Sequence, residues 1–122
     1  MITQVSSLPR ALFVTLPDGQ PLPELEVTTG YAPNEGWRLI IDVKNFTFTD
    51  LCVSKANNLA IGHAHVHLGT QKIMTAYQPN VFIGHLPRGQ HSITVSLRAQ
   101  DHRVLGRPGG GMFSKTITLK VP

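Results

Sequence analysis

The chain has little of what disulfide scaffolds, membrane proteins and hard-cation sites require. Cys52 is the one cysteine among 122 residues, so no internal disulfide can form, and we expect its thiol to pack in the core. No apolar run approaches the ~20 residues that a membrane-spanning helix needs. Only seven residues are acidic, and none lies in the histidine-rich segment 62–70, which argues against a calcium or magnesium site there.

The signatures of nucleophilic enzymes and nucleotide-binding proteins are also missing. The sequence has no Gly-x-Ser-x-Gly motif, no cysteine beside a local base and no close pair of carboxylates. The glycines of residues 109–111 are not followed by the Lys-Ser/Thr pair of a phosphate-binding loop. The net charge is +4, but the eleven basic residues are scattered and no aromatic residues interleave with them, which argues against nucleic-acid binding.

What the chain does have is glycine and proline, eleven and nine residues, spread between short β-type runs. Residues 37–43 and 113–121 are rich in strand-forming residues, and residues 91–99 alternate between apolar and polar side chains. No segment shows the pattern of an amphipathic helix. The sequence therefore predicts one domain, residues 1–122, built as an antiparallel β-sandwich of seven to nine strands, immunoglobulin-like or cupredoxin-like.

The segment Gly62–Thr70 holds three of the six histidines, His63, His65 and His67, at alternating positions. In a strand these three side chains point to one face. The other face is apolar and is predicted to face the core; it carries Ala64, Val66 and Leu68. The histidine face then borders solvent or a cleft.

Strand geometry decides how many of these histidines can bind one ion. Side chains at i and i+2 have Cβ atoms ~6.5–7 Å apart, so His63 and His65 can share an ion, whereas a third residue ~13 Å from the first cannot on a straight strand. If Gly69 and Thr70 form a two-residue hairpin loop, counting outward places Val66 opposite Ile73 and His65 beside Met74. Met74 is then a candidate thioether ligand.

Two further histidines are candidate ligands. His91 shares its strand face with apolar residues, which favours a hydrogen bond to the backbone at the edge of the core over a role as ligand. His102 follows Asp101 where the chain leaves a strand. That position is equally compatible with a metal ligand and with a residue that stabilises a turn.

The donor types narrow the choice of metal. Imidazole together with thioether suits Cu(I), whereas imidazole alone suits Zn(II), Cu(II) or Ni(II). The sequence favours a copper site, with zinc as the alternative ion, built on His63 and His65 and completed from His102, His91 and Met74. Two other interpretations stay open: a metal-free module whose histidine face contacts a protein partner or a carbohydrate, and a small copper metalloenzyme with an open coordination position.

Several short motifs resemble small, largely uncharacterised bacterial extracytoplasmic β-sandwich proteins. They are Gly62-His63-Ala64-His65, Leu86-Pro87-x-Gly89-x-His91 and Asp101-His102. The resemblance runs from about Trp37 to Val121. The family usually has Asn-Gly where this chain has Gly69-Thr70, and an aromatic residue in place of His67.

This resemblance implies that His63, His65, His91 and His102 act together. It also implies a periplasmic or secreted protein, with a signal peptide that is absent from this sequence. The run His65-Val66-His67 is similar to the His-Val-His of copper-zinc superoxide dismutase, but the disulfide pair and the further metal ligands of that enzyme are missing.

Overall fold

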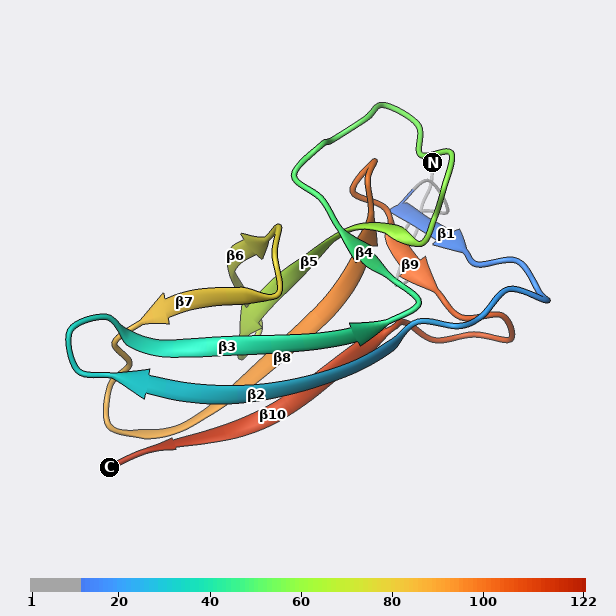
Figure 1. Cartoon of the computed structure of the whole chain (residues 1–122). Coiled ribbons are helices and arrows are strands. Elements are labelled where there is room, and N and C mark those ends of the chain that lie inside the picture. Colours follow the sequence, from blue (N-terminus) through green and yellow to red (C-terminus); the bar gives the residue numbers. More distant parts are fainter. Residues whose placement is uncertain (1–11) are drawn as a thin grey trace, which may run out of the picture.

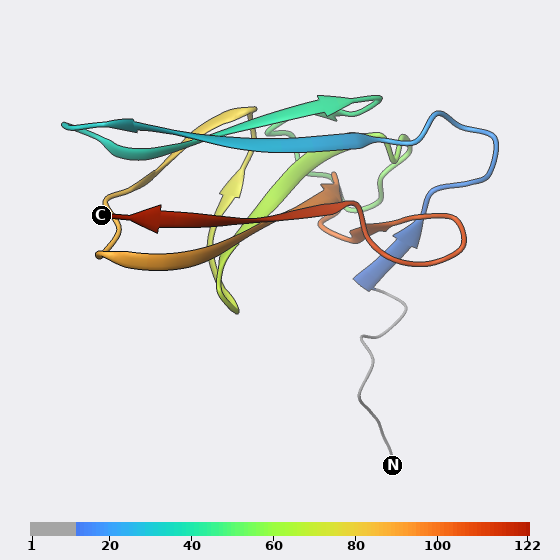
Figure 2. The ribbon, with the colours of Figure 1, turned by 90° about the horizontal axis from the view of Figure 1, so that it is seen from below.

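The computed structural model describes residues 12–122, and this part of the chain is all β. Ten strands form two sheets, which lie in two layers (Figure 1, Figure 2). The strands are β1 (Phe13–Thr15), β2 (Glu24–Ala32), β3 (Gly36–Lys44), β4 (Thr47–Phe48), β5 (Ile61–Leu68), β6 (Gln71–Ala76), β7 (Asn80–Gly84), β8 (Gly89–Ala99), β9 (Val104–Gly106) and β10 (Ser114–Val121).

The larger sheet is organised around an antiparallel pair, β5 and β8. On the far side of β8 lie β10 and β9, and β1 pairs with β9. On the far side of β5 lie β6 and β4. The smaller sheet has the order β2-β3-β7 and is antiparallel throughout. Because β5 has neighbours on both sides, the histidine segment is an interior strand.

Alternation along β5 and β8 decides which side chains enter the core. Val66 of β5 and Leu97 of β8 are 0% exposed and belong to one cluster with Leu39 of the smaller sheet. Full burial of each such side chain contributes about 1.5–3 kcal/mol. The odd-numbered residues of β5, which include the histidines, therefore lie on the face of the larger sheet that points away from the smaller one.

The predicted all-β class is confirmed, and the two layers are sandwich-like, but purely antiparallel pairing is wrong. The pairs β1–β9 and β4–β5 are parallel. Neither pair is joined by a tight hairpin, and strands connected over longer distances can pair in either direction. These short segments also raise the strand count of the described residues to ten, above the predicted seven to nine.

The β5–β6 hairpin confirms the predicted loop but not the predicted register beyond it. Leu68 pairs with Gln71 across the two-residue loop, as expected. A β-bulge between Val66 and His67 then shifts the pairing by one residue, so that Val66 faces Met74 and His65 faces Thr75. The predicted pairing of His65 with Met74 is wrong because an extra residue on one strand reverses the side-chain alternation beyond it.

An irregular segment, residues 49–60, joins β4 to β5 and is tied to the turn between β8 and β9. The Val53 N–H donates to the carbonyl of Gln100 at 3.2 Å, and the Gln100 side chain donates to the carbonyl of Leu51 at 3.1 Å. Cys52 lies in this segment and is exposed, so the prediction of a buried thiol is wrong. Its neighbours form no strand that could carry it into the core.

Because of the bulge, we expect substitution of Met74 to destabilise the protein more than substitution of its neighbour Ile73. Met74 packs against the core, whereas Ile73 is 36% exposed. We expect Met74→Ala to lower the free energy of unfolding by about 1–2 kcal/mol and Ile73→Ala by less than about 0.5 kcal/mol, since the cost follows the apolar surface lost from the core. Urea denaturation of both variants measures this. A larger loss for Ile73→Ala would support the register without a bulge.

Candidate metal centre

Two of the strand histidines are buried although they lie on the outer face of the larger sheet. His63 is 1% exposed and His65 is 9% exposed. Their ring centroids are 5.5 Å apart, and the Tyr77 ring lies 5.5 Å from that of His63. Buried imidazoles need partners for their ring nitrogens. At His63 and His65 the histidine face is therefore covered rather than an open strand surface.

The turn after β8 brings the third histidine to this face. The His102 N–H donates to the carbonyl of Ala99 at 3.0 Å, and the Ala99 N–H donates to the carbonyl of Arg103 at 3.0 Å. His102 has φ = 70°, in the left-handed region that only a few per cent of non-glycine residues adopt, histidine among the more frequent. This tight turn places the His102 ring 4.7 Å from the His63 ring.

Asp101 fixes the turn instead of offering its carboxylate to a metal. Its Oδ2 accepts the Ala56 N–H at 2.9 Å and lies 2.8 Å from Nη2 of Arg103. Burial acts to raise the Asp101 pKa, but the side-chain hydrogen bond from Arg103, the backbone N–H groups of Ala56 and Arg103, and the Arg103 charge outweigh it and lower the pKa to about 2. The carboxylate thus anchors the segment that carries His102 to the β4–β5 segment.

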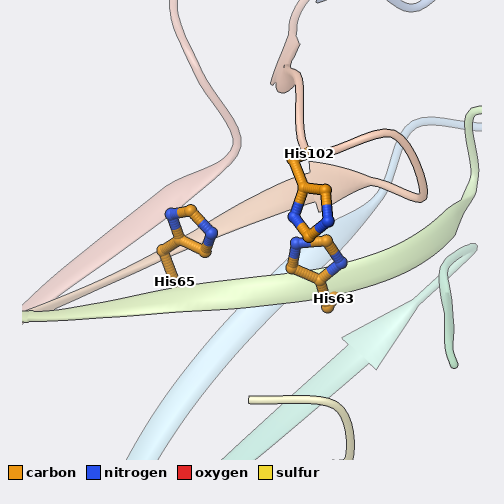
Figure 3. A group of neighbouring side chains, drawn as sticks. All are labelled: His63, His65 and His102. Carbon is orange, nitrogen blue, oxygen red and sulfur yellow. The ribbon is translucent and has the colours of Figure 1, made fainter. Parts of the chain in front are cut away.

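The three histidines form a cluster with the dimensions of a metal site. One ring nitrogen from each of His63, His65 and His102 can be chosen so that all three lie within 4.8 Å of one another. Figure 3 shows the three rings gathered on one side of β5, with His102 reaching in from the turn. Metal–nitrogen bonds of ~2.0–2.1 Å require nitrogen separations of about 3.3 Å in tetrahedral geometry. Nitrogens as far as 4.8 Å apart would have to move closer together to bind one tetrahedral ion.

One buried ring nitrogen in the cluster has no hydrogen-bond partner. Nε2 of His63 is buried and unpaired among the described residues. An unsatisfied buried polar atom costs about 1–3 kcal/mol. A metal ion bound at this nitrogen would remove that cost, so the residues present fit a metal.

The surroundings of the two buried imidazoles favour their neutral form. Burial, followed by the charges of His102, Arg98 and Lys72, lowers the pKa of His63 to about 4. Burial, followed by the charges of Arg98, Lys72, His63 and His67, lowers the pKa of His65 to about 3. Neutral imidazole is the form that binds metal ions. At neutral pH these two histidines would not need to lose a proton before binding a metal ion.

Of the five ligands considered from the sequence, the structure brings together His63, His65 and His102 but not the other two. Met74 packs against the core, on the face of the sheet opposite the histidines. Nε2 of His91 lies 2.7 Å from the carbonyl of Pro87. His91 is also seven residues along β8 from the partner of His63, about 23 Å at the rise of an extended strand. The backbone hydrogen bond favoured for His91 is therefore present.

Sequence reasoning missed Arg98 and Tyr77. Arg98 is the cross-strand partner of His63, and its Nη1 donates to the carbonyl of His102 at 3.2 Å. Tyr77 follows the bulged strand and its ring contacts that of His63. Cross-strand neighbours follow from the register of β5 against β8, two strands that are distant in the sequence. No local pattern indicates them.

Comparison of the chain with protein-family models, with curated proteins and with solved structures finds no match. Within residues 12–122, no helix is long and apolar enough to cross a membrane.

The metal-free protein is expected to lose stability as the pH falls below 6.5. In the unfolded chain His63 and His65 take up protons near their ordinary pKa of 6.5, whereas in the folded protein their pKa values are about 4 and about 3. The unfolded state then binds more protons, so the free energy of unfolding decreases from pH 6.5 down to about 3, with both histidines contributing above about pH 4. Urea denaturation at a series of pH values measures this slope.

The double variant His63→Gln/His65→Gln serves as the control for that slope. It lacks both titrating groups, so its stability should change less over the same pH range. An identical slope in the two proteins would show that other groups cause the loss.

Proposed function

We propose that the protein binds one transition-metal ion, copper in the first place and zinc as the alternative, through His63, His65 and His102. The observation that carries the proposal is the approach of three ring nitrogens within 4.8 Å, together with the unpaired buried Nε2 of His63. Three ligands from the protein leave one position of a tetrahedral ion open. The site thus has the form of an open metal site rather than a closed structural one.

The donor set bears on the oxidation state of the metal. A thioether ligand would favour Cu(I), but Met74 packs against the core on the opposite face of the sheet. A site of three imidazoles suits Cu(II) and Zn(II). Among divalent ions of the first transition row Cu(II) binds such sites most tightly. We therefore propose Cu(II) as the preferred ion.

The biological role follows from the resemblance noted in the sequence. We propose that the protein acts outside the cytoplasm, in the periplasm or secreted, and stores, delivers or senses the metal. A sandwich of immunoglobulin-like or cupredoxin-like type is part of the same proposal. Support comes from the Gly62-His63-Ala64-His65 and Asp101-His102 motifs, whose histidines are the three that the structure brings together.

Calorimetric titration of metal-stripped protein with copper and with zinc tests the binding. We expect one equivalent of copper to bind, and His63→Ala/His65→Ala to weaken it by more than about 100-fold, beyond the 10–100-fold typical of residues outside the coordination shell. His102→Asn, which keeps a residue type tolerant of positive φ, should also weaken binding strongly. Nitrogen hyperfine structure in the electron paramagnetic resonance spectrum of the Cu(II) protein should indicate three imidazole ligands.

His91→Gln is the matched control. It removes a histidine outside the cluster and keeps a donor for the carbonyl of Pro87. Its copper affinity should equal that of the unmodified protein. No binding by the unmodified protein, or binding unchanged by loss of His63 and His65, would contradict the proposal and favour a metal-free interaction module.

A further inference from the structure

Arg98 lies beside the histidine cluster and contacts it directly. It pairs with His63 in the β5–β8 register, so the two side chains share the outer face of the sheet. Its Nη1 donates to the backbone carbonyl of His102 at 3.2 Å. The guanidinium therefore touches the backbone of one proposed ligand and flanks another.

This guanidinium has no anionic partner among the described residues. The ion pairs of residues 12–122 are Arg103–Asp101 and Lys115–Glu26, and Arg98 belongs to neither. Nε of Arg98 is buried without a hydrogen-bond partner. The nearest acidic residue in the sequence, Asp101, is already engaged by Arg103 and by the Ala56 N–H. A partly buried cation thus retains an unused donor at the edge of the cluster.

A bound metal ion would add to this positive charge. Imidazole ligands contribute no negative charge, and Lys72 lies opposite His67 on the neighbouring strand. A divalent ion would then sit beside the Arg98 guanidinium with no carboxylate between them. Two like charges at short range repel each other, and an anion bound next to both would offset that repulsion by attracting each of them.

We propose that the open position of the metal is an oxyanion site, where a small carboxylate-type anion binds the metal and accepts hydrogen bonds from Arg98. The planar guanidinium fork suits carboxylate and carbonate oxygens, and its unpaired Nε supplies a donor. A water molecule at the same position would leave the charge unbalanced. The inference rests on the proposed metal site and names the ligand class that completes it.

The test measures copper affinity with and without acetate, in a non-coordinating buffer and with correction for copper–acetate complexes in solution. Acetate should raise the Cu(II) affinity of the unmodified protein by about tenfold or more, since coupled ligands strengthen each other by the same factor. Without acetate, Arg98→Gln should bind Cu(II) more tightly than the unmodified protein, because a repulsive charge is gone. Acetate should raise the Cu(II) affinity of Arg98→Gln by less than about threefold.

Two further variants separate the effect of the Arg98 charge from that of its planar guanidinium. Arg98→Lys keeps the charge but lacks the planar fork, so its gain from acetate should lie between those of the unmodified protein and Arg98→Gln. Arg38→Gln removes an exposed arginine from β3 of the other sheet. It should leave the Cu(II) affinity unchanged, both with and without acetate. Circular dichroism of each variant checks that the fold is retained.

The outcomes distinguish the two proposals. Absence of copper binding to the unmodified protein would overturn the metal site and this inference together. Copper binding that acetate leaves unchanged, or an acetate effect that Arg98→Gln retains in full, would overturn the oxyanion site and leave the metal site standing. The titration of unmodified protein needs no variant, so the inference can be tested even if substitution of Arg98 impairs folding.

Discussion

The pairing of β5 with β8 is the constraint on which both the core and the candidate site depend. On one face of these two strands Val66 and Leu97 are fully buried against the smaller sheet. On the other face the same register sets His63 beside Arg98. The approach is close at the start of β5, where a Cβ on Gly62 would collide with the carbonyl oxygen of Arg98. Glycine is required there for the two backbones to meet.

The site combines neutral donors with a positive environment. Burial and nearby cations hold the pKa values of His63 and His65 well below 6.5, which keeps both imidazoles in the metal-binding form. The same cations oppose a bound dication. Under the proposed function, metal binding and charge compensation are therefore linked, and an external anion is the simplest way to satisfy both. Asp101 does not serve that purpose because it holds the turn of His102 in place.

The turn at His102 places backbone strain at the histidine cluster. A non-glycine residue at positive φ carries a conformational cost of order 1–3 kcal/mol, retained only where the surrounding structure holds it in place. Here the carboxylate of Asp101, the N–H of Ala56 and the backbone bonds between Ala99 and Arg103 hold it. These contacts join the β4–β5 segment to the β8–β9 turn. The third histidine of the cluster is thus positioned by residues from two distant parts of the chain.

The sequence alone predicted the features that depend on short-range periodicity. The two-residue alternation of a strand predicted that His63 and His65 share a face and that Val66 lies in the core, and both predictions are confirmed. The two-residue loop at Gly69 and Thr70 was likewise predicted from its turn residues. A β-bulge has no comparable local signature, so the position of Met74 could not be read from the sequence.

Tertiary structure decided which further residues join the two strand histidines. His102 and His91 were both candidates, and they lie near opposite ends of β8, so only the fold could show that the turn after this strand carries one of them to His63. Arg98 became part of the site through cross-strand pairing. Contacts of this kind depend on strand register and on packing between segments far apart in the chain, whereas alternation along one strand follows from the backbone itself.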